Sequence, residues 1–204
     1  EAPLLMGVDV ARFGDDESVI TFRRGRDARS KKQKTYKGVD TSTLAMHVAN
    51  AIECENPDAV FVDGAGVGGG VIDRLRQLGY RVIEVQSGEK ADASDKYLNK
   101  RVEMWGLMRE WLKTGCLTKN EQLEGELIAP EYEITPKGQV KLETKESMKK
   151  RGVASPDFAD ALALTFAHKV GYKADLSREK IKRESAFDRR NEWFGGRIDG
   201  GWMI

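Results

Sequence analysis

Three short stretches of the chain place aspartates where an apolar run meets a turn or a helix start. Asp9 lies in LMGVDVARFGDD, Asp63 lies in AVFVDGAG, and Asp157 and Asp160 lie in SPDFADALAL. An aspartate is almost never fully buried unless it is paired or binds a metal ion. Carboxylate oxygens gathered in this way suit a hard divalent cation. The pattern therefore predicts one metal site built from segments that are far apart in sequence.

Each of these acids also has a structural interpretation. Asp157 could serve only as a favourable charge in the first turn of a helix, and Asp63 could close a turn with Gly64. Asp9 has the weakest structural alternative, because an unpaired carboxylate inside an apolar strand is costly. Taken together, three or four aspartates match the needs of two-metal phosphodiester cleavage, in which the ions hold the attacking and leaving oxygens.

A glycine-rich segment directly follows Asp63. The run from Gly64 to Gly69 fits G-x-G-x-x-G, and Glu84 lies about 20 residues further on, as in a dinucleotide-binding fingerprint. Asp63 would repel a pyrophosphate unless a cation intervened. We therefore favour glycines that let the backbone approach a site closely. The sequence contains no G-x-x-x-x-G-K-[ST] motif, so we expect no P-loop ATP hydrolysis from it.

Basic residues cluster in two segments, although the net charge of the chain is only +1. The segment from Arg23 to Lys37 contains eight lysines and arginines and a single acid, Asp27. Six more lysines and arginines occur between Lys137 and Arg151. On its own, such clustering favours solvated loops. The alternative interpretation is that these side chains contact phosphates.

The elements that must position the acids follow from composition and periodicity. The 204 residues are 40% hydrophobic and 33% charged, which is typical of one domain with a solvated surface. Apolar patterning predicts three antiparallel strands over 4–10, 18–22 and 34–39, followed by a helix capped by Thr41 or Ser42. A strand over 59–62 then delivers Asp63, and a short helix and a strand over 81–85 follow it. The rest of the domain is predicted as a helix over 97–114, a hairpin over 131–143, and a helix from Ser155-Pro156 to about His168. Periodicity alone supports an α/β fold, and the order of elements matches a ribonuclease-H-like mixed sheet.

We expect a domain over 1–170 and a charged, loosely ordered tail over 171–204. The chain opens with EAPLLMG, without an initiator methionine and almost directly in a strand, so we expect it to be part of a longer protein.

Four segments together resemble the C-terminal nuclease domain of tailed-phage terminase large subunits. They are GVDVARFGDDESVI, VFVDGAGVGGGVIDRLRQLG, YLNKRVEMWGLMREWL and KESMKKRGVASPDFADALAL, and the resemblance runs from about residue 4 to residue 170. The segment SPDFADALAL is also similar to the last motif of RuvC-type Holliday-junction resolvases, in which both acids of D-x-x-D sit at the metal site.

The resemblance implies a ribonuclease-H-like fold: a three-strand antiparallel meander extended by parallel strands, flanked by helices, with an auxiliary hairpin. It also implies an endonuclease that uses two Mg²⁺ or Mn²⁺ ions to cut concatemeric double-stranded DNA with little sequence specificity. Asp9 and Asp63 match the first two metal-binding acids of that family. Asp160 matches the third, and Asp157 is an additional or alternative ligand.

The same resemblance implies partners: double-stranded DNA, the ATPase motor domain of the same polypeptide, the portal protein and the small terminase subunit. The implied location is the host bacterial cytoplasm at the procapsid portal, outside the mature virion and away from membranes. Six basic residues become candidate DNA contacts: Arg24, Arg26, Lys31, Lys32, Lys141 and Lys145.

Three alternatives remain at this stage. A RuvC-like resolvase would share the acids but require branched DNA. A DNA- or portal-binding module would carry a catalytically silent site. An actin-like phosphotransferase would share the meander, but its nucleotide-binding motifs are not evident.

Overall fold

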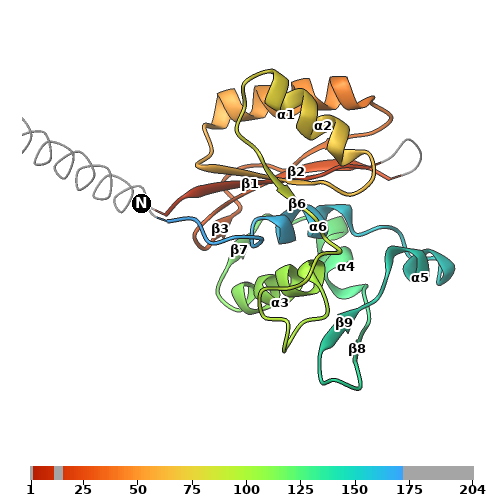
Figure 1. Cartoon of the computed structure of the whole chain (residues 1–204). Helices are drawn as coiled ribbons and strands as arrows, with labels where there is room; N and C mark the ends of the chain where they lie inside the picture. Colours follow the sequence, from red (N-terminus) through yellow and green to blue (C-terminus); the bar gives the residue numbers. More distant parts are fainter. Residues whose placement is uncertain (1, 12–15, 172–204) are drawn as a thin grey trace, which may run out of the picture. The chain divides into compact units, whose positions relative to one another are not determined.

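The computed structural model describes residues 2–11 and 16–171, and Figure 1 shows the chain as a ribbon. Within this part of the chain, Pro3–Val170 form a compact unit. The predicted loosely ordered tail lies outside the described residues apart from Gly171. None of the described helices has the length and apolar character needed to cross a membrane.

The core of the unit is a mixed sheet. Its strands are β1 (Leu4–Asp9), β2 (Ser18–Arg24), β3 (Asp27–Ala28), β4 (Lys34–Tyr36), β5 (Ala59–Asp63), β6 (Ile83–Val85) and β7 (Cys116–Leu117). The order is β6-β5-β1-β2-β3-β7, with β4 also paired to β2. β1 pairs antiparallel with β2 and parallel with β5. The predicted ribonuclease-H-like mixed sheet is thus confirmed, with the apolar first strand at its centre.

Alternation along the central strands assigns each residue to one face of the sheet. Met6 and Val8 of β1 pack with helices α1 (Thr41–Glu55) and α2 (Gly68–Gln77). Leu5 of β1 and Phe61 of β5 pack instead with α3 (Lys100–Leu112), α4 (Glu121–Ile128) and α6 (Asp157–Leu164). Figure 1 shows these helices as two layers on opposite sides of the sheet.

Several helix boundaries differ from the sequence predictions. Asp40, rather than Thr41 or Ser42, caps α1, because its carboxylate accepts the amide of Thr43. The helix predicted over 97–114 spans only Lys100–Leu112, because Asn99 caps it. Before the cap, the amide of Tyr97 bonds to Ala93 in the preceding loop and the amide of Leu98 bonds to Val140 in the hairpin. Two short helices, α4 and α5 (Lys145–Lys150), and the two-residue strands β3 and β7 had not been predicted.

The last core helix also begins later and ends earlier than predicted. Pro156 is its N-cap, and no side chain of the N-cap residue accepts a helix amide. The hydroxyl of Ser155, which we predicted to be the cap, donates to Asp157 instead. Helix α6 ends at Leu164, and the next residues form turns.

The predicted hairpin is present as a separate two-strand sheet, β8 (Tyr132–Ile134) and β9 (Val140–Leu142). Gly138 takes the left-handed backbone conformation, φ 80°, that its turn requires. The chain leaves β9 and enters α5 directly, with Thr144 as N-cap. The hairpin therefore sets where α5 and its first residue, Lys145, are placed.

Candidate metal centre

The sheet brings Asp9 and Asp63 to the same end of neighbouring strands. β1 and β5 are parallel, with Val8 opposite Val62, and each aspartate is the next residue on its strand. Both lie on the face that carries Leu5 and Phe61, because side chains alternate along a strand. This face is the one covered by α6.

Helix α6 lies against β1 at Gly7. A Cβ atom at this position would stand 2.1 Å from the carbonyl oxygen of Ala161, so only glycine allows this approach. Asp157 and Asp160 are three residues apart in the first turns of α6 and therefore share a face. The close contact brings that face beside Asp9.

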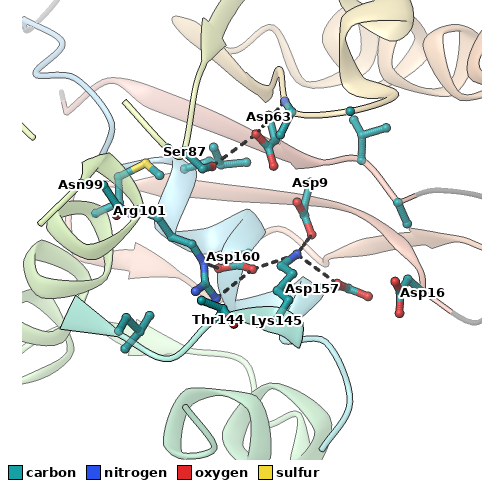
Figure 2. A pocket seen from close by; sticks show the side chains of 18 of the residues that line it. Asp9, Asp16, Asp63, Ser87, Asn99, Arg101, Thr144, Lys145, Asp157 and Asp160 are labelled. Carbon is teal, nitrogen blue, oxygen red and sulfur yellow. Dashed lines mark hydrogen bonds and ion pairs between the residues drawn. The ribbon is translucent and has the colours of Figure 1, made fainter. Parts of the chain in front are cut away.

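The four predicted aspartates line one pocket of about 500 Å³. Figure 2 shows Asp9, Asp63, Asp157 and Asp160 around this pocket, carried by two strands and one helix. Asp9, Asp157 and Asp160 are buried, with exposed fractions of 3%, 6% and 8%. The sequence therefore predicted correctly that these acids lie together; their role as ligands stays a prediction.

The ammonium group of Lys145 lies among three of these carboxylates (Figure 2). Its Nζ is 3.0 Å from Asp160 Oδ2, 3.5 Å from Asp9 Oδ2 and 3.6 Å from Asp157 Oδ1. We had predicted Lys145 as a phosphate contact. The structure places it as the cation that balances the acid cluster, and its contact with phosphate stays a prediction.

The electrostatics of this group follow from burial and crowding. Burial raises the pKa of Asp9 well above its usual value; the charges of Asp160, Asp157 and Asp63 raise it further, and Lys145 opposes them. Burial would lower the pKa of Lys145, but the surrounding carboxylates outweigh burial and raise it. Lys145 is therefore charged, and its charge favours the ionised form of Asp9.

Asp160 is held by two side chains of α3. The indole Nε1 of Trp105 donates to Oδ1 at 2.7 Å, and the guanidinium of Arg101 donates to both oxygens at 3.1 and 3.4 Å. Burial alone would raise the pKa of Asp160, but Arg101, Lys145 and Trp105 outweigh burial and lower it. This carboxylate is therefore ionised and fixed in orientation.

Asp63 and Asp157 are oriented by other donors. Asp63 Oδ1 accepts the amide of Ala65 and the hydroxyl of Ser87, and burial raises the pKa of Asp63. Asp157 accepts the hydroxyl of Ser155 and the amide of Glu17. Asp63, Asp157 and Asp160 thus each accept hydrogen bonds that orient them, whereas Asp9 is paired with Lys145.

The donor set fits a hard divalent cation, since it consists of carboxylate oxygens only. In the arrangement described, no three His, Cys, Asp or Glu side chains within residues 2–11 and 16–171 are placed to hold a metal ion. The ammonium of Lys145 takes the central position among the acids. Binding of a divalent ion there requires this side chain to move.

The remaining predicted DNA contacts are spread over the surface. Arg24, Arg26, Lys31 and Lys32 lie toward the other end of β2, since Arg24 pairs with Leu4 while Asp9 pairs with Val19. Lys31 forms an ion pair with Glu55. Lys141 lies on the hairpin and pairs with Glu133. The structure therefore brings only Lys145, of the six, to the acids.

Sequence reasoning missed several residues that orient the acids: Arg101, Trp105, Ser87 and Ser155. Arg101 and Trp105 did carry a signal, because they are four residues apart on a predicted helix and so share a face. Nothing in the sequence indicated that Asp160 was their partner. The ring of Trp105 is buried.

Comparison with known proteins places the fold. No protein-family profile matches the sequence, and no curated protein matches it. Among solved structures, the nuclease domain of the large terminase subunit of bacterial virus Sf6 is similar, with a TM-score of 0.72 and 18% identity, over 84% of this chain and 90% of that chain.

Two further solved structures have the same fold. The large terminase nuclease of thermophilic phage G20c has a TM-score of 0.61 at 15% identity, over 83% of this chain and 84% of its own. The corresponding domain of Thermus phage P74-26 has a TM-score of 0.57 at 15% identity, over 84% of each chain. Other structures of these domains contain manganese, in a lysine-to-alanine variant of the Sf6 domain, or magnesium, in the G20c domain. The chain therefore has the fold of phage terminase nuclease domains.

Proposed function

We propose that this chain is the nuclease domain of a phage DNA-packaging terminase and cuts double-stranded DNA with the help of divalent cations. The observation that carries the proposal is the convergence of four aspartates on one pocket, in a fold shared with terminase nuclease domains. Manganese and magnesium in structures of similar domains support Mn²⁺ or Mg²⁺ as the cation.

In this proposal, two divalent ions supply Lewis-acid stabilisation of the attacking and leaving oxygens. The chain contributes the four carboxylates that line the pocket. Asp9 and Asp63 stand on the sheet, and Asp157 and Asp160 stand on α6. Arg101 and Trp105 keep Asp160 ionised and aimed into the pocket. The hydroxyl of Ser87 and the amide of Ala65 donate to Asp63 and fix the orientation of its carboxylate.

The proposed substrate is concatemeric DNA, bound with little sequence specificity. Lysines and arginines contact phosphates without reading bases, so affinity should fall steeply as salt rises. The proposed contacts are Arg24, Arg26, Lys31, Lys32 and, on the hairpin, Lys141. The proposed partners are the ATPase motor domain, the portal protein and the small terminase subunit, which together would place the domain at the procapsid portal.

A plasmid assay tests the proposal. The purified domain is incubated with supercoiled plasmid in Mn²⁺ or Mg²⁺, and the nicked and linear products are measured. We expect cleavage with either ion, none in EDTA, and a loss of at least about 100-fold in Asp160→Asn, because this change removes an ionised ligand. Asp73→Asn, on the exposed side of α2, is the matched control and should cleave as wild type does.

Two outcomes would contradict the proposal. Nicking that persists in both EDTA and Asp160→Asn would mean that the activity does not arise at this site. Cleavage of four-way junctions with linear and supercoiled duplex left intact would indicate a resolvase instead.

A further inference from the structure

Helix α6 begins without a cap of its own. The first helical amides normally bond to the side chain of the N-cap residue, but that residue is Pro156, which has no polar side chain. The neighbouring Ser155 does not substitute: its hydroxyl donates to Asp157, and none of the described helix amides bonds to its oxygen. The helix that carries both Asp157 and Asp160 therefore depends on an acceptor from elsewhere.

Glu126 of α4 supplies this acceptor. Its Oε2 accepts the amide of Ala159 at 3.0 Å, and Ala159 occupies the third position of α6, where a cap normally bonds. Its Oε1 accepts the side-chain amide of Gln122 at 3.2 Å. The side chain of Glu126 is buried, with an exposed fraction of 8%. It lies 33 residues before Ala159 in the sequence, so the bond depends on the packing of α4 against α6.

The position of this bond connects it to the acid site. Ala159 lies between Asp157 and Asp160, and the three residues belong to the first two turns of the helix. Loss of the bond would leave the Ala159 amide buried without an acceptor and would loosen the first turn, which carries Asp157. Asp160 has further restraints from α3, so we expect Asp157 to lose its position first.

We propose that Glu126 is a positioning residue that caps α6 from another helix and so fixes the carboxylates of Asp157 and Asp160 for cation binding. This inference rests on the proposed function, because it assigns Glu126 a role in the same site. Glu126 itself does not touch the reacting atoms. It acts through the backbone of α6.

The test compares two substitutions at Glu126 with one control. Glu126→Met fills a similar volume without an acceptor, whereas Glu126→Gln keeps an amide oxygen that Ala159 can use. Glu124→Met, on the exposed face of the same helix, is the matched control. Mn²⁺ affinity is measured by calorimetry, and hydrogen exchange reports the protection of the first-turn amides of α6.

We expect Glu126→Met to weaken Mn²⁺ binding about 10-fold, the usual effect of losing a partner that orients a metal ligand. The amide of Ala159 should exchange faster in the same variant, while strand β1 stays protected. Glu126→Gln should stay within about threefold of wild type in affinity, and Glu124→Met should match wild type in both measurements.

The inference is overturned if Glu126→Met exchanges faster at Ala159 but binds Mn²⁺ as wild type does, since Glu126 would then be purely structural. It is also overturned if Glu126→Gln loses as much affinity as Glu126→Met. If Glu126→Met fails to fold, a loss of Ala159 protection or of Mn²⁺ affinity in Glu126→Gln overturns it. If the wild-type protein binds no Mn²⁺, the proposed function fails, while exchange at Ala159 still tests the cap itself.

Discussion

At the scale of the residue, the ammonium group of Lys145 occupies the position among the acids that the proposed divalent ion would take. Its ammonium group lies within 3.0–3.6 Å of three carboxylates. A divalent ion must therefore compete with a charge that is already present.

Replacing Lys145 by alanine should therefore raise Mn²⁺ affinity. We expect an increase of about tenfold, equivalent to about 1.4 kcal/mol, because a competing cation is removed and the carboxylate charge is left uncompensated. Calorimetry on Lys145→Ala measures this, with Lys150→Ala on the exposed side of the same short helix as control. Weaker Mn²⁺ binding in Lys145→Ala than in Lys150→Ala would show that the ammonium group does not compete with the ion.

Glu126 gives the protein a predictable response to pH. Burial is the main reason that its pKa rises to about 7, although the Ala159 amide opposes this. Because the folded state binds the proton more tightly than the unfolded state, the resulting stability is present at acidic pH and is lost as pH rises through about 7.

In EDTA, the free energy of unfolding of wild type should therefore fall between pH 5 and pH 8, relative to Glu126→Gln, by at most about 3 kcal/mol. Denaturant unfolding across this range measures the difference. Parallel pH profiles for the two proteins would mean that Glu126 is ionised throughout.

At the scale of the element, the site depends on how closely α6 approaches β1. Gly7 permits contact with the backbone of Ala161, and this contact sets the distance between Asp9 on the strand and the acids on the helix. A methyl group at position 7 cannot be accommodated, because the obstructing atom is backbone rather than a flexible side chain.

Gly7→Ala should therefore destabilise the protein by about 1–3 kcal/mol, the usual cost of overpacking, and should also weaken Mn²⁺ binding. Gly69→Ala is the matched control, because nothing lies within 4 Å of the added atom and alanine favours the helix. Urea unfolding measures both variants. Equal stability of Gly7→Ala and wild type would show that α6 can shift without cost.

Some elements of the fold could be predicted from the sequence, and others could not. Strands β1 and β5 were predictable because their apolar runs are nearly continuous, and Asp9 and Asp63 were conspicuous within or directly after those runs. Helix α5 has six residues and no apolar periodicity, so no sequence pattern predicted it. The position of Lys145 among the acids therefore could not be predicted from the sequence.

The partners of the acids were equally hidden, because each pairing spans distant segments. Arg101 and Trp105 meet Asp160 more than 50 residues later in the chain, and only the packing of α3 on α6 brings them together. Glu126 gave no sign of its role, since a single glutamate on a short helix is ordinarily a surface residue. The acids followed from local patterns, whereas their supports followed from the tertiary fold.

At the scale of the whole molecule, cation binding should stabilise the folded protein. An ion that binds only the folded state adds about 2.7 kcal/mol when its concentration is 100 times its dissociation constant. For a chain of this size, that corresponds to a rise of roughly 5–10 °C in the unfolding temperature.

Thermal unfolding with and without Mn²⁺ measures this shift. We expect it in wild type and in Asp73→Asn, and we expect it to be lost in Asp9→Asn, which removes a ligand at the centre of the sheet. An equal shift in Asp9→Asn and wild type would mean that the ion binds at a different place.

The location of the bound ions is the most direct test of the central claim that these four aspartates form the cation site. Crystals of the domain soaked in Mn²⁺ are measured at a wavelength where manganese scatters anomalously. The account predicts anomalous density in contact with Asp9, Asp63 and Asp160, with the side chain of Lys145 moved out of the cluster. Density confined to other surfaces, with Lys145 still in contact with the acids, would contradict it.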